Sequence, residues 1–421
     1  MKKLLVLFTN GYPYGSSEPF LENEVPLYKE YFDKVLIVTP CRKGDRPTRT
    51  VDDSIEVLPD YTLAKDLPSI LSAIPGMLRD KMFYRELKLL FGREGFSFKK
   101  LYDLVVASLC ANHRAKQALR WLKKHPEHTP QVLYSYWINI PAYSALRLRK
   151  RLKRPTLPCV TRCHGFDVYH ERSSTGYLPF QQQLFEGMNQ VAVISQQAKG
   201  YFQQRYGASE KMKLHRLGAW DYGIENPVTD RAPLRLVSCA RVVPLKRLNR
   251  IVDALCLIKN RPIYWTHIGG GEGLAELERY AAERLGENVT VHFTGAVTNE
   301  QVYRIYMEQS FHVALNVSET EGVPVSVMET MSFHIPAIAT AVGGTAELVD
   351  HGKNGFLLPK DFADETLVEY IRRFADMPDE EYRSFRRSAR RKFETDYHAQ
   401  TNYRRFVSRL AQMCKIPSDS L

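Results

Sequence analysis

The chain alternates short, strongly apolar runs with longer segments of helical pattern, and this alternation constrains its fold more than any other feature. The short runs are rich in Val, Leu and Ile. Strands buried on both faces and separated by helices are typical of a parallel sheet. In the first half the predicted strands are Leu4–Thr9, Lys34–Thr39, Gln131–Tyr136, Pro158–Arg162 and Gln190–Ser195, and the predicted helices between them include Pro19–Tyr31, Ala115–Lys124 and Ala142–Leu152.

The same pattern starts again after a polar, proline-containing stretch at Ile224–Pro233, which we interpret as a linker. A length of 421 residues is also enough for two or three domains, each with its own core. The sequence therefore predicts an α/β protein with two doubly wound domains, 1–220 and 234–395, whose ligands bind at the carboxyl ends of the strands. The region Glu365–Met413 looks helical throughout. The predicted strands of the second domain are Leu234–Ala240, Ile263–Ile268, Val289–Thr294, Phe311–Val317 and Ile338–Val342.

Two glutamates, Glu321 and Glu329, stand eight residues apart after the predicted strand Phe311–Val317. Pro324 suits the first turn of a helix, and Ser326–Met331 can continue that helix. Glu321 therefore falls on the loop before the helix, and Glu329 lies about a turn and a half inside it. Loop amides and a helix N-terminus attract phosphate, and the two carboxylates can contact hydroxyl groups at two points along a nucleotide.

An isolated pair of glutamates at this spacing is more often two solvated charges on a helix face. Here the pair lies in the run Ser318–Pro359, which also contains the turn Gly343-Gly344-Thr345. This run resembles the donor-sugar segment of the retaining GT-B glycosyltransferases of family 4. The resemblance implies the GT-B fold, in which two Rossmann-like domains face each other across a cleft and the last helix, here about 396–413, packs back on the first domain. It also implies donor contacts for Glu321 (sugar hydroxyls), Glu329 (ribose), and the segment of Gly322, Val323, Pro324 and Val325 (sugar or phosphate).

Two cations, Arg241 and Lys246, follow the predicted strand Leu234–Ala240. Basic residues are common at strand–helix junctions, so this pair alone is a weak signal. Together with the glutamates it resembles the diphosphate-binding Arg/Lys pair of the family. Such a pair neutralises the charge of a leaving nucleoside diphosphate, so we expect no metal and no other cofactor.

His164 follows the predicted strand Pro158–Arg162, and Gly165 after it permits a tight turn. A single histidine is more often a satisfied structural group than a site residue. The run His164-Gly165-Phe166-Asp167 nevertheless resembles a family signature in which the histidine contacts the donor sugar from the opposite domain. Asp167 is either an acceptor-side residue or the cap of the next helix.

The loop Asn10–Phe20 joins the first predicted strand to the first predicted helix. In the family this loop is glycine-rich and lies against the donor phosphates and the acceptor, whereas this chain has Ser16 and Ser17 in place of the usual glycine pair. Glu18 then serves the acceptor or lies in the first helical turn. The run Gly269–Glu272 has neither a P-loop nor a dinucleotide-binding pattern, and we interpret it as a strand–helix turn.

Positive charge is concentrated in the first half of the chain. Residues 1–220 contain 34 Lys and Arg against 20 Asp and Glu, a formal charge of +14, whereas residues 221–421 contain 25 against 27, a charge of −2. Such asymmetry indicates a polyanionic partner, which can be a nucleic acid, an anionic membrane surface or a phosphorylated substrate. Residues 79–100 mix basic and aromatic residues, so they form either a helix with one core face or an interfacial membrane element to which Phe83, Phe91 and Phe96 add an apolar component.

Location and redox state follow from simpler features. The seven cysteines are scattered and odd in number, which is typical of free thiols in a reducing compartment, and Cys159 and Cys163 lack the second close pair of a metal site. No apolar run reaches the roughly 18 residues that span a bilayer. The apolar run Leu4–Phe8 is too short for a signal peptide. We expect a cytoplasmic protein, peripheral at the inner face of the plasma membrane.

The function that these features and the resemblance predict is transfer of a sugar from a UDP- or GDP-sugar to a glycan or lipid-diphosphate-linked acceptor, with retention of anomeric configuration, in the assembly of a bacterial surface polysaccharide. One alternative is a nucleotide-sugar epimerase of the same fold, which would share the nucleotide site but need no acceptor surface. A nucleic-acid-binding protein is another, but the aromatic residues of the first half form no stacking motif.

Overall fold

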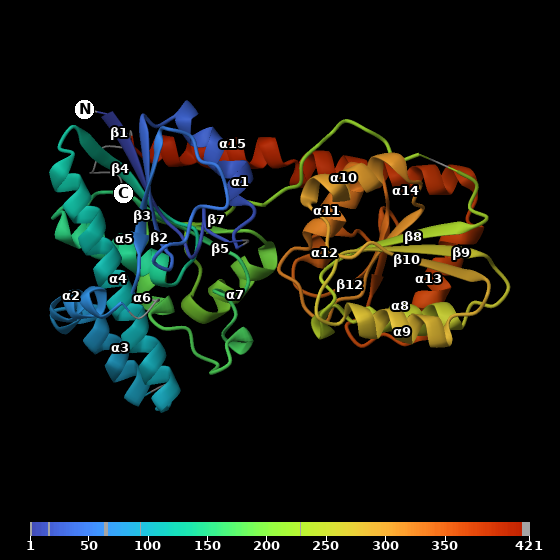
Figure 1. Ribbon diagram of the computed structural model, residues 1–421, viewed down its shortest axis with the longest axis horizontal. Helices are drawn as coiled ribbons and strands as arrows, with labels where there is room; N and C mark the ends of the chain where they lie inside the picture. Colours follow the sequence, from blue (N-terminus) through green and yellow to red (C-terminus); the bar gives the residue numbers. More distant parts are fainter. Residues whose placement is uncertain (1, 16, 63–65, 93, 228, 415–421) are drawn as a thin grey trace. The chain divides into compact units, whose positions relative to one another are not determined.

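The chain folds into two compact units (Figure 1). The computed structural model describes residues 2–15, 17–62, 66–92, 94–227 and 229–414. Unit 1 consists of Met1–His215 with Tyr403–Leu421, and unit 2 consists of Arg216–Asn402. Unit 2 is therefore one continuous stretch of chain, whereas unit 1 is assembled from two stretches.

Unit 1 is built on a seven-stranded sheet in which every pair of neighbouring strands is parallel, in the order β3-β2-β1-β4-β5-β6-β7. The central strand β1 shows why both faces are covered: Leu4, Val6 and Phe8 belong to one apolar core, and Leu5 and Leu7 belong to another. The strands are β1 (Lys2–Phe8), β2 (Lys34–Pro40), β3 (Ile55–Asp60), β4 (His128–Ser135), β5 (Cys159–Cys163), β6 (Gln190–Val193) and β7 (Met212–Leu214).

Helices cover both faces of this sheet. On one face the first core contains side chains of the long helix α4 and of α3, α5, α6 and α7. On the other face the second core includes side chains of α1 and η1 and, from the end of the chain, Phe406, Val407, Leu410 and Met413 of α15. The helices are α1 (Leu21–Glu24), η1 (Val25–Glu30), α2 (Leu67–Leu78), α3 (Lys81–Phe91), α4 (Phe98–Lys124), α5 (Ile140–Arg151), η2 (His170–Arg172), α6 (Gln181–Gly187), α7 (Gln196–Tyr206) and α15 (Ala399–Met413).

Unit 2 repeats the plan with a six-stranded parallel sheet in the order β10-β9-β8-β11-β12-β13. Figure 1 shows α8 and α9 on one face of this sheet and α10 and α11 on the other. The strands are β8 (Leu234–Cys239), β9 (Ile263–Ile268), β10 (Val289–Phe293), β11 (Val313–Asn316), β12 (Ala337–Thr340) and β13 (Gly355–Leu358). The helices are η3 (Pro244–Lys246), α8 (Asn249–Cys256), α9 (Leu274–Arg284), α10 (Asn299–Glu308), α11 (Val325–Ser332), α12 (Thr345–Leu348), α13 (Asp364–Asp376), α14 (Asp379–Lys392) and the π-helix η4 (Phe393–Tyr397).

The strand order reverses once in each sheet. In unit 1 the reversal lies between β1 and β4, and in unit 2 it lies between β8 and β11. At such a switch point the loops that follow two neighbouring strands turn to opposite faces and leave space for a ligand. The fold class predicted from the sequence, an α/β protein with two doubly wound parallel sheets, is confirmed.

Three expectations on the elements are wrong. The edge strands β3 and β7 were not predicted because they are only partly covered, and β13, a mostly buried edge strand of four residues, was missed as well. The region Glu365–Met413 is not helical throughout, since Met377 and Pro378 separate α13 from α14 and His398 separates η4 from α15. Phe83 on α3 is buried in the core, so it adds nothing to an exposed apolar surface.

Over the part of the chain that the structure describes, no helix is both long and apolar enough to cross a membrane.

Candidate active site

The switch point of unit 2 brings two of the predicted residues into contact. Lys246 ends the short helix η3 after β8, and Glu321 lies on the loop after β11, the strand beside β8. The Lys246 ammonium donates to Glu321 Oε1 over 2.6 Å, and both side chains are largely buried. A third residue joins them, because the Asn316 amide lies 3.4 Å from the same oxygen. A cation and a carboxylate, 75 residues apart in sequence, thus meet where a ligand of this fold binds.

The loop between Glu321 and α11 presents backbone donors at the same place. Pro324 is the N-cap of α11 rather than its first helical residue, and its extended backbone turns the chain into the helix. The amides of Gly322, Val323 and Val325 have no hydrogen-bond acceptor among the described residues. Such amides, together with the positive end of the helix dipole, can bind an anion.

The turn after β12 fixes this loop from behind. Gly343 has a φ of +57°, and a Cβ at this position would approach the carbonyl oxygen of Glu321 to 1.9 Å. The Gly344 amide donates to the Gly322 carbonyl over 2.6 Å. The glycine turn therefore packs directly against the Glu321 loop. Only glycine allows it.

Glu329 is separate from the ion pair and nearly inaccessible. Its carboxylate accepts from the Asn299 amide of α10 over 3.2 Å. Burial raises its pKa to about 7, with the Asn299 and Tyr303 side chains opposing the rise. The Tyr303 pKa is itself raised, first by burial and then by the nearby Glu329 carboxylate. Near neutral pH, Glu329 therefore populates both the carboxylate, which only accepts hydrogen bonds, and the protonated acid, which can also donate one.

Arg241, the other predicted cation, is exposed after β8, and the described residues include no hydrogen-bond or ion-pair partner for its side chain. Its loop is held by the glycine run after β9. A Cβ on Gly269 or Gly271 would lie 2.1 or 2.5 Å from the carbonyl oxygens of Ala240 and Val242. This run is a strand–helix turn, as predicted, and its role is to let two loops pack closely.

The switch point of unit 1 holds a second cluster, centred on Glu18. This residue adopts a φ of +58° and is buried. Its carboxylate accepts from the amides of Asn10 and Tyr12 over 2.8 and 2.6 Å and from the Trp137 indole over 2.6 Å. Glu18 lies before α1 rather than in its first turn, so that alternative is wrong. Its oxygens are committed to shaping the first loop and fixing Trp137.

His164, after β5, packs against the same cluster. Its ring centre lies 4.4 Å from that of Tyr136 and 4.5 Å from that of Trp137. Burial, and next to it the Arg162 guanidinium, lower its pKa to about 3, so the ring is neutral at physiological pH. Since Nε2 lies 3.1 Å from the Tyr136 carbonyl oxygen, which can only accept, Nε2 carries the proton and Nδ1 is left as an acceptor.

Asp167 supports His164 from below and caps no helix. Its two oxygens accept from the backbone amides of His164 and Ile138 over 2.8 and 2.9 Å, which ties the loop after β5 to the loop after β4. Burial raises its pKa to about 6, and these amides oppose the rise. Of the two remaining acceptor-side candidates, Ser17 is exposed and its carbonyl accepts from Arg49 over 2.7 Å. Ser16 lies outside the described residues.

Four members of these clusters were not predicted from the sequence. Trp137 follows a predicted strand directly, so its position was a usable signal. Asn316 is the last residue of β11 and carried the same signal. Asn299, which is exposed, and Tyr303, which is buried, lie one turn apart on α10, where nothing in the sequence distinguishes them from other residues of the helix.

The segment that carries the donor-side residues has a recognisable family. Residues 226–392 match the family model described as glycosyl transferases group 1. The match describes this segment, which is less than half of the chain. The group 1 segment contains Arg241, Lys246, Glu321 and Glu329 and lies within unit 2.

Known proteins resemble more of the chain than this segment. A protein described as a glycosyltransferase of colanic acid biosynthesis, WcaL of Escherichia coli K12, is 27% identical over 256 residues, which are 59% of this chain and 62% of that protein. The lipopolysaccharide outer core galactosyltransferase WaaB in its apo form matches 98% of this chain and 100% of its own, with 15% identity and a TM-score of 0.67. HepE of Anabaena in complex with UDP-glucose matches 97% and 99%, with 15% identity and a TM-score of 0.62. The two solved structures support the GT-B fold class.

Proposed function

We propose that this group 1 protein transfers a sugar from a nucleotide sugar to a hydroxyl group of a glycan or lipid-linked glycan, with retention of anomeric configuration. The observation that carries the proposal is the contact between Lys246 and Glu321 at the switch point of the group 1 segment. A cation suited to a diphosphate and a carboxylate suited to sugar hydroxyls are adjacent there, as a bound nucleotide sugar requires.

The residues of unit 2 have distinct parts in this reaction. Lys246, Arg241 and the amides ahead of α11 bind the diphosphate and stabilise the negative charge that grows on it as the bond from the sugar C1 breaks. Glu321 accepts from sugar hydroxyls. Glu329, in its buried site with Asn299, bonds the ribose. The diphosphate leaves with the electron pair of the broken bond and takes the proton of the acceptor hydroxyl, whose oxygen bonds C1 on the same face.

The cluster of unit 1 has its own parts in the proposed reaction. The neutral His164 ring offers Nδ1 to a donor-sugar hydroxyl, because its other nitrogen donates to the Tyr136 carbonyl. Glu18 and Asp167 act as positioning residues for Trp137 and His164, and the first loop with Ser16 and Ser17 borders the acceptor. The charge of +14 over residues 1–220 suits an acceptor with phosphate groups.

The proposed reaction needs no metal. Lys246, Arg241 and the backbone amides provide the positive field that a metal ion provides in other transferases. Among the described residues no group of three His, Cys, Asp or Glu side chains is arranged to hold a metal ion. EDTA should leave the initial rate unchanged, and recovery of a lost rate on addition of manganese or magnesium would contradict this part of the proposal.

The proposed setting is assembly of a bacterial surface polysaccharide at the inner face of the plasma membrane. The similar protein WcaL is described as acting in colanic acid biosynthesis, and WaaB as acting on the lipopolysaccharide outer core. A UDP-sugar is the first donor to test because HepE is in complex with UDP-glucose, and GDP-sugars are the second. Exposed aromatic residues on α3 and α4, beside Lys88 and Lys99, fit contact with an anionic membrane.

The decisive measurement is release of nucleoside diphosphate from a panel of UDP- and GDP-sugars, with and without a lipid-linked glycan acceptor. Release that depends on the acceptor, together with a product whose anomeric configuration by NMR equals that of the donor, supports a retaining transferase. Conversion of the donor into another nucleotide sugar without acceptor would instead support the epimerase alternative. A thermal-shift screen selects the donor, since a ligand at 100 times its Kd stabilises by about 2.7 kcal/mol.

A further inference from the structure

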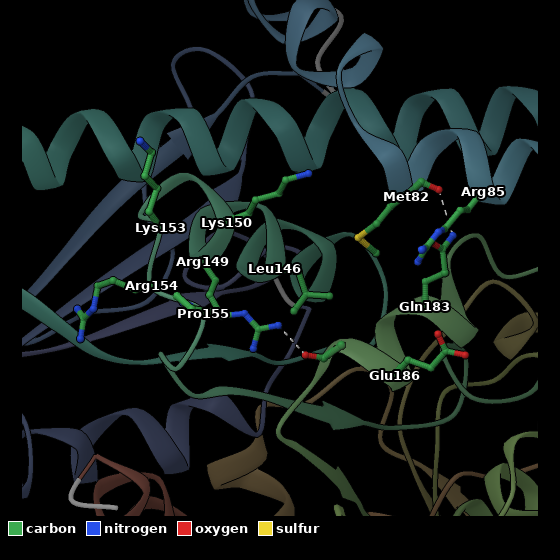
Figure 2. Close-up of a pocket in the computed structure, with 11 residues that line it drawn as sticks. Met82, Arg85, Leu146, Arg149, Lys150, Lys153, Arg154, Pro155, Gln183 and Glu186 are labelled. Carbon is green, nitrogen blue, oxygen red and sulfur yellow. Dashed lines mark hydrogen bonds between the residues drawn. The ribbon is translucent and has the colours of Figure 1, made fainter. Parts of the chain in front are cut away.

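Unit 1 contains an open hollow that none of the proposed steps uses (Figure 2). It has a volume of about 670 Å³ and lies between α3, the end of α5 and α6. Met82, Leu146 and Pro155 contribute apolar wall. Five cationic side chains and one carboxylate, that of Glu186, complete the lining, so the hollow is strongly positive.

The cations are of two kinds. Arg149 and Arg154 are held by the protein, because Arg149 donates to the Gly187 carbonyl over 2.9 Å and Arg154 donates to the Pro130 carbonyl over 2.8 Å. Arg85, Lys150 and Lys153 have no hydrogen-bond or ion-pair partner within the described part of the chain. Glu186, the one acidic residue of the lining, accepts from Gln182 over 3.0 Å. Three cations with no anionic partner are therefore available to a ligand.

This hollow lies near the amino ends of the strands, whereas the Glu18 and His164 cluster lies at their carboxyl ends. Arg154 binds a residue near the start of β4, and Arg149 also donates to Asn189 just before β6. Glu18, Trp137 and His164 instead follow the ends of β1, β4 and β5. Since β4 has eight residues, the two ends of this strand are on the order of 20 Å apart. The hollow is therefore separate from the acceptor-side cluster.

We propose that this hollow is a binding site for the phosphate or diphosphate group of a ligand. The geometry offers N–H donors from guanidinium and ammonium groups, which are the groups that recognise phosphate, and a preformed pair of arginines whose orientation costs no further ordering. Met82, Leu146 and Pro155 lie among the cations, and these apolar side chains suit a ligand whose phosphate is attached to an apolar body. The site does not depend on the proposed transferase reaction.

Its test needs a variant that removes the free cations and a matched control. Lys150→Gln with Lys153→Gln removes two charges from the end of α5, and Lys123→Gln with Lys124→Gln removes two exposed charges from the end of α4, outside the lining. Both pairs are made in the full chain carrying Lys246→Ala, which disables the candidate donor site. Binding of inorganic diphosphate is measured by calorimetry. We expect Kd to rise at least tenfold in the first pair and less than twofold in the second.

A second arm identifies the source of the phosphate. Co-sedimentation with phosphatidylcholine vesicles is compared with and without phosphatidic acid. Binding that requires phosphatidic acid and falls in the Lys150 and Lys153 pair supports the site with a lipid headgroup as ligand, and binding of inorganic diphosphate alone supports it with a soluble ligand. Equal losses of binding in the two double variants, or no binding of either probe by the parent chain, would overturn the proposal. Neither result would change the nucleoside diphosphate release of the chain with Lys246 intact, so the proposed transferase activity is tested separately.

Discussion

Most of the proposed chemistry depends on two residues, Lys246 and Glu321. Their side chains form an ion pair with each other before a ligand binds. The pair is largely buried, so neither charge is well solvated. A bound diphosphate offers Lys246 a stronger partner and releases Glu321 to accept from sugar hydroxyls. The contact thus keeps both side chains in the orientation that a nucleotide sugar needs.

Replacing any of the three groups at this point should abolish most of the transfer. We expect Lys246→Ala, Arg241→Ala or Glu321→Ala to lower the rate of nucleoside diphosphate release about a hundredfold, the scale of losing one preorganised electrostatic donor. Glu329→Ala should mainly weaken nucleotide binding. Lys353→Ala on the surface of the same unit is the control. Near-normal rates in all four variants with a verified donor would show that the site is elsewhere.

Glu329 should make the stability of unit 2 depend on pH. Burial raises its folded-state pKa to about 7 from an ordinary value of 4.5, so the folded state binds this proton more tightly than the unfolded state. The stabilisation is fully present below about pH 4.5 and is lost as pH rises to about 7, a change of about 3 kcal/mol at most. Glu329→Gln should remove this slope when the two proteins are compared by Tm from pH 4.5 to 8. If Tm changes with pH in the same way in both proteins, this prediction is wrong.

At the scale of elements, α15 closes the core of unit 1 over a buried charge. The Arg162 guanidinium of β5 lies 4.0 Å from the centre of the Phe406 ring and forms an ion pair with Glu24, with both charged groups fully buried. Arg162 also lies two residues before His164. The packing of the last helix therefore fixes the strand whose end carries a candidate site residue.

Removing one partner of this buried pair should be far more damaging than breaking a surface pair of α15. We expect Arg162→Met to cost about 3–5 kcal/mol of unfolding free energy, because it leaves the Glu24 carboxylate buried without its cation. Adding Glu24→Gln should recover much of the loss. Arg404→Ala, which removes the exposed pair with Glu30, should change stability far less. Denaturant unfolding of the four proteins measures this, and equal losses for Arg162→Met and Arg404→Ala would refute it.

The second prediction at this scale concerns the exposed aromatic cluster of α3 and α4. Phe91 and Phe98 are 61% and 83% exposed, and Phe96 touches both, with ring centres 4.9 and 5.3 Å away. We expect Phe91→Ser with Phe98→Ser to reduce co-sedimentation with anionic vesicles and to leave neutral vesicles unbound. Raised salt should weaken the binding further, because screening acts on the surrounding cations.

Two comparisons control this experiment. Leu257→Ser, at an exposed apolar residue of unit 2, should have no effect. Changing Arg85, Lys88 and Arg93 to Glu should abolish binding to anionic vesicles, although Arg93 lies outside the described residues. Equal binding of neutral and anionic vesicles, or none of either, would leave the positive charge of this half to the phosphates of the acceptor.

At the scale of the whole molecule, the chain enters and leaves unit 2 at neighbouring points. In unit 2 the Asn402 amide donates to the Leu217 carbonyl over 2.9 Å, and in unit 1 the His215 and Phe406 rings are 5.0 Å apart. Unit 2 therefore behaves as a continuous insertion into unit 1, which is the arrangement that permits a domain to fold by itself.

Residues 216–402 expressed alone should bind the nucleotide sugar, because the whole group 1 segment and its core belong to that stretch. Residues 1–215 alone should aggregate, since the sheet face that Phe406, Val407 and Leu410 cover would be exposed. Joining 215 to 403–414 through a short Gly-Ser linker should restore a soluble unit 1. Calorimetry and size-exclusion chromatography measure the two outcomes. Loss of nucleotide binding by a folded 216–402 would place part of the donor site outside it.

The fold class and the succession of buried strands along the chain follow from the sequence alone. Central parallel strands are covered on both faces, so each leaves a continuous apolar run that can be recognised locally. The partly covered edge strands β3 and β7 leave no such run, and β13 is only four residues long, so all three were missed. The sequence also placed Glu321 and His164 on loops after strands and Lys246 at a strand–helix junction, because these positions follow directly from the strand–helix alternation.

Tertiary structure alone decided which of these residues meet. The Lys246–Glu321 contact depends on β8 lying beside β11, and strand order is a property of the whole sheet. The Glu18 carboxylate accepts from the Trp137 indole, a group 119 positions away, and no local pattern shows this contact. The lowered pKa of His164 and the raised pKa of Glu329 likewise come from burial, which depends on neighbours distant in the chain. Local sequence specifies which elements form, but electrostatics and hydrogen bonding at the site depend on distances that only long-range packing sets.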